Sequence, residues 1–338
     1  MSLRTSNGIG NDDFLAAFRH LPRLVYRDDP LWAPQSEGAV DECLQRAQRG
    51  AIEIEMAMSA GAEARAVAIL TSGDGAEIGR QGQVGLFECL AGSPDAGVAV
   101  LEHCMDWLWS RGARRVVAPR VDQLRAGLQV SGFDLPQTIF TAHNPPHYAD
   151  MFRAVFDTET LMNSFLFSKK RVPRFRPSRK GAFSIRRFDP EHLDTELARV
   201  EDLQREVFAG RIGYMARDHS SARQTMVNLL PVVDPDLIVM ACNDDECLIG
   251  LLICVPDAWQ AADAVDRARL MSVAVAPDWQ RRGVAMTMGS ELARTLLVKG
   301  YQTLEGSWVL ESNRRTLRLA RLLGAEPGRK FALYSTDF

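Results

Sequence analysis

Residues 276–300 read APDWQRRGVAMTMGSELARTLLVKG, and they follow directly on the apolar run LMSVAV. The run predicts a buried strand, while Met288, Leu292 and Leu296 recur at the spacing of one helix face. Gly300 follows the last turn, where glycine commonly ends a helix. The stretch therefore predicts a strand, a short turn and a helix, with basic residues and a glycine in the turn.

The turn has the features of a phosphate site. A helix N-terminus presents unpaired N–H groups and a partial positive charge, so it attracts anions. Gly283 has no side chain to obstruct a close approach, and the small Ala285 lets the helix start nearby. Arg281 and Arg282 can add charge-assisted hydrogen bonds at the rim. We expect the backbone of this turn to hold a pyrophosphate.

The bulk composition is that of an ordinary globular protein. With 338 residues, two domains are expected, because one core rarely exceeds about 250–300 residues. The net charge of -3 and the pI near 6.1 give no overall bias toward polyanions. The six cysteines form no CxxC pair and no zinc-like cluster, so no metal is expected and a reducing compartment fits. The N-terminus lacks a signal-like apolar stretch and no long apolar run occurs, which predicts a cytoplasmic protein without a membrane partner.

The two halves of the chain repeat one order of expected elements: helices, a hairpin, a strand, a helix, a strand and a helix. Between them, residues 167–187 contain nine basic residues, no acidic residue and two prolines. We predict a first domain over 1–168, a basic linker over 169–181 and a second domain over 182–338. A nucleic-acid patch in the linker is the less favoured alternative, because few aromatic residues accompany the basic ones.

The order Gln-x-x-Gly-x-Ala after an apolar strand resembles the acyl-CoA loop of the GNAT superfamily of N-acetyltransferases. LMSVAVAPDWQ and ESNRRTLRLARLLGAE also resemble GNAT segments, so the resemblance covers about residues 267–335. It implies an α/β (α+β) fold with two tandem GNAT-like domains, each a mixed, mostly antiparallel sheet flanked by helices. It further implies that acetyl-CoA, or another acyl-CoA, binds the second domain. The implied cofactor-binding residues are Val273, Val275, Gln280, Arg281, Arg282, Gly283, Val284, Ala285 and Asn313. Asn313 has a second interpretation as an ordinary N-cap residue.

The sequence contains three candidate catalytic residues: Tyr334, Glu305 and Glu311. Many GNAT enzymes have a proton-donating tyrosine seven residues after the asparagine, where this chain has Ala320. Tyr334 is a substitute candidate, although a buried core role fits it as well. Glu305 and Glu311 are the carboxylates best placed to take a proton from an amine.

The first half resembles bacterial tandem proteins in which a degenerate GNAT-like domain comes first. The resemblance rests on the segments LPRLVYRDDPLWAPQ, GLFECL and HNPPHYADMFRAVF. After GLFECL the chain lacks a phosphate loop, and Asp95 puts negative charge where a phosphate would lie. The first half is therefore expected to shape the acceptor site without binding acyl-CoA.

These features predict an acyl-CoA-dependent N-acyltransferase that acts by direct transfer on a small amine or amino-acid-like acceptor. Two alternatives stay open: a non-catalytic acyl-CoA-binding or regulatory protein, and an aminoacyl-tRNA-dependent transferase. The acceptor is further expected to depend on residues 210–221 (GRIGYMARDHSS), for which the sequence offers no mechanism. A monomer and a homodimer are both compatible with two fused halves.

Overall fold

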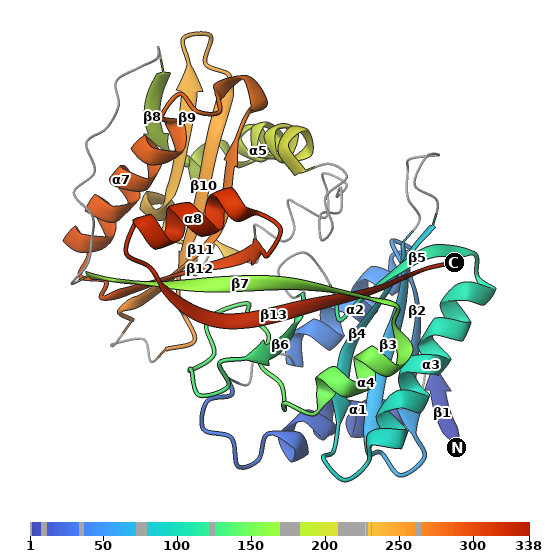
Figure 1. Cartoon of the computed structure of the whole chain (residues 1–338). Coiled ribbons are helices and arrows are strands. Elements are labelled where there is room, and N and C mark those ends of the chain that lie inside the picture. Colours follow the sequence, from blue (N-terminus) through green and yellow to red (C-terminus); the bar gives the residue numbers. More distant parts are fainter. Residues whose placement is uncertain are drawn as a thin grey trace. The chain divides into compact units, whose positions relative to one another are not determined.

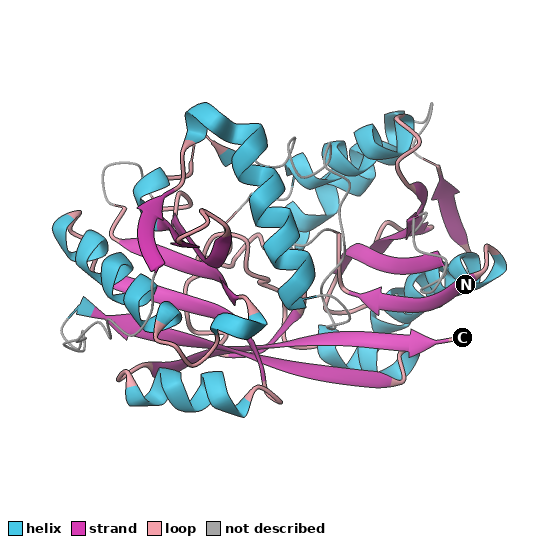
Figure 2. Cartoon of the chain, turned by 90° about the horizontal axis from the view of Figure 1, so that it is seen from above, coloured by secondary structure: helices cyan, strands magenta, loops and turns pink. Residues whose placement is uncertain are grey.

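The computed structural model describes residues 2–7, 12–33, 37–71, 80–121, 126–169, 183–208, 227, 229–230, 232–260 and 265–338. It divides into two compact units (Figure 1). The first unit contains Met1–Met162 and Arg329–Phe338, and the second contains Asn163–Gly328. Each unit is a mixed sheet with helices beside it (Figure 2), which confirms the predicted fold class.

The first unit is built on the strand order β1-β2-β3-β4-β5-β13, and β6 pairs with β13 off this path. Most of its pairs are antiparallel, whereas β4 and β5 run parallel. Its elements are β1 (Leu3–Ser6), α1 (Asp12–Val25), α2 (Glu37–Gln48), β2 (Glu53–Ser59), β3 (Ala64–Thr71), β4 (Arg80–Cys89), α3 (Pro94–Ser110), β5 (Ala113–Ala118), β6 (Leu128–Ser131) and α4 (Tyr148–Val155).

Strand β3 is buried on both faces, because helices cover each side of the first sheet. Its small residues, such as Ala66 and Ala68, lie in the core that contains α3. The alternating Val67 and Ile69 lie in a second core with α1 and α2. Side chains alternate between the two faces of a strand, so one continuous apolar run serves both cores. Small residues on one side let α3 pack close to the sheet.

The second unit has the strand order β7-β12-β11-β10-β9-β8. The pairs from β8 to β11 are antiparallel, and β11 runs parallel to β12. Helix α5 packs against β10 and β11, while α7 packs against β9, β10 and β11 on the opposite face (Figure 1). The elements are β7 (Thr158–Ser168), β8 (Phe183–Arg187), α5 (Leu193–Phe208), β9 (Ile238–Asn243), β10 (Leu248–Pro256), β11 (Arg267–Val275), α7 (Val284–Val298), β12 (Thr303–Leu310), α8 (Arg314–Leu322) and β13 (Glu326–Asp337), with short 3-10 turns at Pro190–His192, Pro235–Leu237 and Pro277–Trp279.

The unit boundaries differ from the domain boundaries expected from the sequence. Strand β7 passes from the first unit into the second after Met162, and the chain returns to the first unit at Arg329. There β13 pairs with β5, with Tyr334 opposite Ala118, and with β6. The C-terminal strand was expected within the second domain. Its partners are more than 190 residues away in sequence, and a local pattern contains no information about such a pairing.

The secondary structure agrees with most local expectations. The hairpins β2–β3 and β9–β10 form as expected. The apolar face of α5 buries Leu197, Val200 and Leu203. The predicted linker lies outside the described residues except for Lys169, and the whole segment 210–221 also lies outside them. Among the helices that the structure describes, none is long and apolar enough to cross a membrane.

Candidate functional site

Strands β11 and β12 run in parallel and then separate. Their ladder ends where Leu270 pairs with Gly306, although β11 continues to Val275 and β12 to Leu310. On its other edge, β11 stays paired with β10 as far as Val275. The separation leaves a gap beside residues 271–275, and we refer to it below as the β11–β12 gap.

Backbone groups of β11 face this gap. The N–H of Ala276 donates to the Ile249 carbonyl of β10 over 2.9 Å. Because successive residues of a strand direct their backbone groups to opposite edges, those of Val273 and Val275 point toward the gap. Val273 is 42% exposed, and the Gln280 side chain donates to the Val275 carbonyl over 3.3 Å. The predicted residues Val273, Val275 and Gln280 therefore lie together at the end of β11.

The turn before α7 has an uncommon backbone. Arg281 has φ +65° and Gly283 has φ +88°, both in the left-handed region. A non-glycine residue there is uncommon, and such backbone strain often marks functional sites. Gly283 is the N-cap of α7, and no side chain among the described residues caps the helix in its place.

The first turn of α7 has backbone donors that lack a partner inside the helix. The first intrahelical hydrogen bond runs from the Thr287 N–H to the Gly283 carbonyl over 2.9 Å. The N–H groups of Val284, Ala285 and Met286 consequently have no carbonyl partner inside the helix. The first turn contains no acidic residue. This arrangement suits an anion, because the helix dipole and the free donors act together.

Aromatic contacts order the basic side of the turn. The Arg282 guanidinium lies 5.1 Å from the ring centroid of Trp279, within the range of a cation–π interaction. Trp279 in turn contacts Phe183 edge to face at 6.4 Å. The charge of Arg282 is thus held beside the α7 N-terminus.

Gly250 of β10 sets how closely α7 approaches the sheet. A Cβ at this position would lie 2.7 Å from Val284 Cγ1 and about 3 Å from the Met288 side chain. A glycine inside an apolar strand often indicates close approach of another element. The glycine in LIGLLICV was the available signal, and the sequence-based prediction did not use it.

Buried polar residues lie at the closed end of the gap. Arg269 and Glu305 face each other in the β11–β12 ladder, and each is 1% exposed. Arg269 Nε donates to Ser307 Oγ over 3.0 Å, and its guanidinium lies 4.7 Å from the Trp308 ring centroid. Such burial is stable only when opposite charges and hydrogen bonds compensate each other. The predicted Glu305 therefore belongs to a polar cluster, which we define as Arg269, Glu305, Ser307 and Trp308.

The remaining predicted residues lie elsewhere. Glu311 is exposed in the turn after β12. Asn313 caps α8, since its side chain accepts a hydrogen bond from the Thr316 N–H over 3.2 Å. Ala320 is buried within α8. Tyr334 is fully buried in the core of the first unit.

The Tyr334 hydroxyl already has a partner in that core. It donates to Glu159 Oε1 over 2.8 Å, and burial raises the pKa of Tyr334. Its ring lies against Phe152 at 5.3 Å. These contacts describe a structural residue of the first unit.

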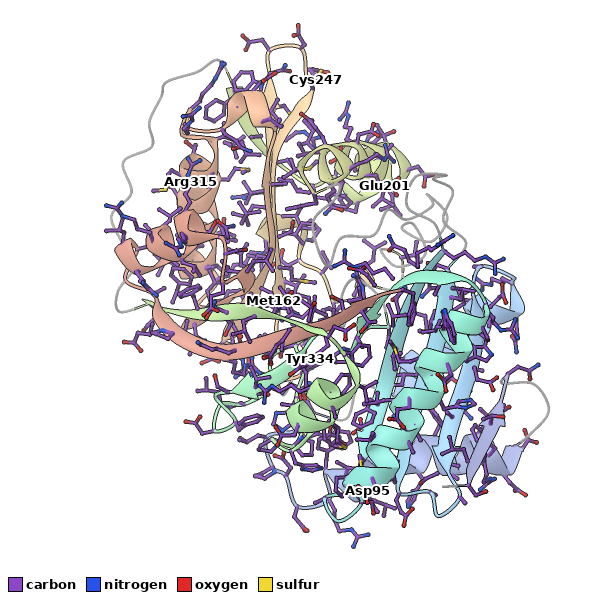
Figure 3. The ribbon with its side chains drawn as sticks, turned by 45° about the vertical axis from the view of Figure 1, so that its right-hand side comes forward. Asp95, Met162, Glu201, Cys247, Arg315 and Tyr334 are labelled. Atoms are coloured by element: carbon purple, nitrogen blue, oxygen red, sulfur yellow. The ribbon has the colours of Figure 1, made fainter. Side chains whose placement is uncertain are left out.

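The corresponding position of the first unit is closed. Beyond the ladder of β4 and β5, the Arg120 N–H donates to the Val84 carbonyl over 2.8 Å. A Cβ on Gly85 would lie 2.3 Å from the Arg120 carbonyl oxygen, so the chain fills this space. At the start of α3, Pro94 lacks an N–H group and Asp95 adds negative charge (Figure 3). The first unit thus lacks the features that make the α7 turn suitable for an anion.

The described residues contain no group of three or more His, Cys, Asp or Glu side chains that could hold a metal ion. All six cysteines lie in the described part of the chain and are free thiols.

Comparison with known proteins relates part of the second unit to a known protein family. Residues 199–325 match the family model of the acetyltransferase (GNAT) family. This segment of the second unit is a GNAT domain, and it contains both the gap and the α7 turn. The chain as a whole resembles tandem GNAT proteins.

Two relatives with curated descriptions are similar over much of the chain. The bacterial ceramide synthase of Caulobacter vibrioides (strain NA1000 / CB15N) is 24% identical over 74% of this chain and 74% of its own length. Protein YghO of Escherichia coli (strain K12) is 22% identical over 96% of this chain and 93% of its own length.

Solved structures share the fold at low identity. A tandem GNAT protein from the clavulanic acid biosynthesis pathway has a TM-score of 0.60 at 14% identity, covering 99% of this chain and 98% of that protein. A GCN5-related N-acetyltransferase from Sphaerobacter thermophilus has a TM-score of 0.57 at 14% identity, covering 99% and 95%. The glucosamine N-acetyltransferase region of a fungal multi-domain enzyme has a TM-score of 0.64 at 16% identity. The match covers 99% of this chain but only 38% of the fungal chain.

Proposed function

We propose that this protein is an acyl-CoA-dependent N-acyltransferase, with acetyl-CoA as the simplest donor and a small amine or amino-acid-like molecule as the acceptor. The observation on which this rests is the α7 N-terminus, with free N–H groups, a left-handed glycine and two arginines beside the β11–β12 gap. An acyl-CoA has an anionic pyrophosphate and a reactive thioester, so it fits a donor-rich turn next to an open strand edge. We keep the cytoplasm as the expected compartment.

We assign the donor contacts as follows. The N–H groups from Val284 to Met286 hold the pyrophosphate, and Arg281 and Arg282 add charge at the rim. The backbone of Val273 and Val275 holds the pantetheine arm by hydrogen bonds. An N–H group near Val273 donates to the thioester carbonyl oxygen, where negative charge develops during attack.

We assign Glu305 as the group that takes the proton from the acceptor amine, directly or through one water. Its position at the closed end of the gap and its burial opposite Arg269 favour it over the exposed Glu311. In the transfer, the amine nitrogen forms a bond to the acyl carbon as the carbon–sulfur bond breaks. The amine loses one proton and the leaving thiolate gains one. We assign that second proton to solvent, because Ala320 cannot donate it and Tyr334 donates to Glu159.

The acceptor class has two candidates. The first candidate, a small amine or amino-acid-like molecule, follows from the GNAT resemblance. The name of the Caulobacter relative, a ceramide synthase, adds a lipid amine, since a ceramide is an N-acylated lipid base. A panel that includes polyamines, amino acids and a long-chain amine separates these two.

Calorimetric titration of acetyl-CoA into the full chain tests the donor site. Gly283→Glu should weaken binding at least tenfold, because a side chain and an anion enter the position that phosphate requires. Gly300→Glu is the matched control: Gly300 has φ +89°, follows the other end of α7 and is subject to the same backbone strain. Unchanged binding in Gly283→Glu, or equal losses in both variants, would refute the phosphate site.

Turnover separates the enzyme from the alternatives. Release of the free CoA thiol with an amine panel supports a transferase, and Glu305→Gln should then lower kcat by about 10²-fold. Glu311→Gln should leave kcat within about twofold. Because the loss of a buried charge can destabilise a fold by about 3–5 kcal/mol, acetyl-CoA binding by Glu305→Gln is measured to check that this variant folds. Binding without any turnover favours a regulatory acyl-CoA-binding protein, and RNA that co-purifies at low salt favours the tRNA-dependent reaction.

A further inference from the structure

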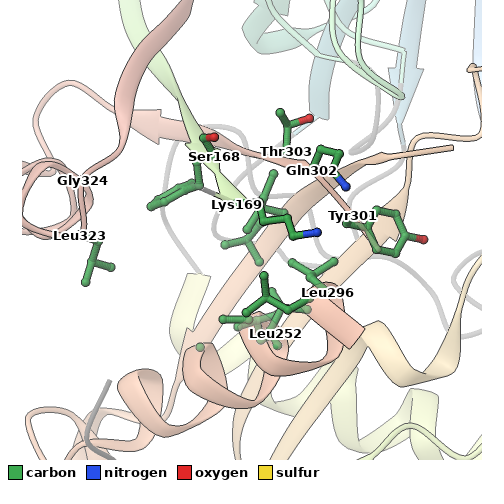
Figure 4. A pocket seen from close by; sticks show the side chains of 16 residues that line it. Ser168, Lys169, Leu252, Leu296, Tyr301, Gln302, Thr303, Leu323 and Gly324 are labelled. Atoms are coloured by element: carbon green, nitrogen blue, oxygen red, sulfur yellow. The ribbon is translucent and has the colours of Figure 1, made fainter. Parts of the chain in front are cut away.

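An apolar pocket lies in the second unit between α7, the C-terminal end of α8 and the sheet (Figure 4). Its volume is about 140 Å³. Residues of α7, β10, β11 and β12 line it, and Ser168 and Lys169 at the end of β7 lie beside it. Seven of the sixteen residues that line it are leucines, among them Leu252, Leu270, Leu292 and Leu304.

One glycine keeps part of this pocket open. Gly289 lines the pocket in the interior of α7, on the same helix face as Leu292 and Leu296. A Cβ built on Gly289 has no neighbouring atom within 4 Å. Glycine inside a helix is destabilising relative to alanine. Helix α7 thus has its weakest helix former at the position where a side chain would fill the pocket.

The pocket extends to the closed end of the β11–β12 gap. Leu270 is the last paired residue of β11 in that ladder, and it lines the pocket together with Leu304. Side chains alternate between the faces of a strand, so the neighbouring Arg269 and Glu305 project to the opposite face. The closed end of the gap therefore has an apolar side toward α7 and a polar side toward α5.

We propose that this pocket holds the hydrocarbon chain of the acyl donor, so that the preferred donor is a medium-chain acyl-CoA. The inference rests on the proposed function, which puts the thioester at the closed end of the gap. A chain that continues from there past Leu270 enters a leucine-lined space, whereas an acetyl group leaves it empty. An apolar cavity of about 150 Å³ accommodates benzene, so the pocket takes a chain of about six carbons. Transfer to the amine is the same bond exchange for acyl chains of either length, and no further reactant is required.

The test compares the affinities of CoA, acetyl-CoA and hexanoyl-CoA for the full chain by calorimetry. Each buried methylene strengthens binding by about fourfold, corresponding to about 0.8 kcal/mol. Hexanoyl-CoA has four more methylenes than acetyl-CoA, so it should bind at least tenfold more tightly. Gly289→Leu should remove this advantage of hexanoyl-CoA, while the affinity for acetyl-CoA should stay unchanged and so provide the reference. Gly289→Ala should reduce the advantage in part.

Gly38→Leu is the matched control, because Gly38 is a helical glycine of α2 with equally open surroundings in the first unit. It should leave all three affinities unchanged. Leucine is a better helix former than glycine, so Gly289→Leu is expected to fold. If it does not, Gly289→Ala provides the same comparison.

The outcomes separate this inference from the proposed function. If no CoA ligand binds, the proposed function fails. If acetyl-CoA and hexanoyl-CoA bind equally, the function stands and the acyl pocket is refuted. The acyl pocket is also refuted if free hexanoate binds, Lys169→Ala abolishes that binding, and Gly289→Leu leaves hexanoyl-CoA affinity unchanged. The pocket would then be a separate site for an anionic amphiphile.

Discussion

Replacing Glu88 by glutamine should make the first unit less sensitive to pH. Glu88 on β4 is buried and accepts a hydrogen bond from the Tyr148 hydroxyl over 2.9 Å. Burial raises its pKa to about 7, against the opposing charge of the buried Arg65 and hydrogen bonds from Tyr148 and Tyr26. In the folded protein, the carboxyl group is therefore largely neutral at pH 5 and becomes ionised near pH 7.

The size of the effect follows from the two pKa values. The unfolded chain ionises Glu88 near its ordinary pKa of 4.5, about 2.5 pH units below the folded value. Between these two pH values the folded state binds more protons than the unfolded state, so stability falls as pH rises. The contribution of neutral Glu88 to the free energy of unfolding is complete below pH 4.5 and is lost as pH rises through about 7. At about 1.4 kcal/mol for each unit, the total is about 3 kcal/mol, of which about 2 kcal/mol is lost between pH 5 and 7.

Hydrogen exchange of β3 and β4 peptides, measured along a urea series from pH 5 to 8, reports the free energy of unfolding of the first unit. Wild type should lose about 2 kcal/mol between pH 5 and 7, and Glu88→Gln should lose less than about 1 kcal/mol, because the amide does not ionise. Glu102→Gln, at an exposed position of α3, is the control and should behave as wild type. Identical pH dependence in wild type and Glu88→Gln would refute a raised pKa at this residue.

Three further predictions concern the second unit. Gly250→Ala should destabilise it by about 1–3 kcal/mol in urea denaturation, because the new methyl group overlaps Val284, and unchanged stability would contradict this contact. Asn313→Ala should cost about 1 kcal/mol through loss of the α8 cap, and a large additional loss of acetyl-CoA affinity in calorimetry would show that Asn313 also binds the donor. Trp279→Ala should weaken acetyl-CoA binding severalfold by releasing Arg282, with Arg282→Gln as the comparison; additive losses in the double variant would argue against this coupling.

Local sequence was sufficient to predict the secondary structure of the second unit around the α7 turn. The apolar run of β11, the turn with Gly283 and the stripe of Met288, Leu292 and Leu296 are short-range signals, and the structure has each element there. Gly283 was predicted for the close approach that its missing side chain allows, and its left-handed φ, which glycine adopts without a Cβ clash, is an additional finding of the structure. The GNAT assignment of residues 199–325 agrees with the resemblance that these residues indicated.

The tertiary structure decided the features that depend on distant residues. The strand that contains Tyr334 pairs with β5 of the first unit, which moved this tyrosine from the expected site into a core. The register of β11 and β12 brought Arg269 opposite Glu305, and the packing of α7 and α8 on the sheet left space at Gly289. Residue order specifies local backbone conformation and the apolar faces. Partner strands, registers and residual cavities are instead set by the simultaneous packing of all elements, which no single segment contains.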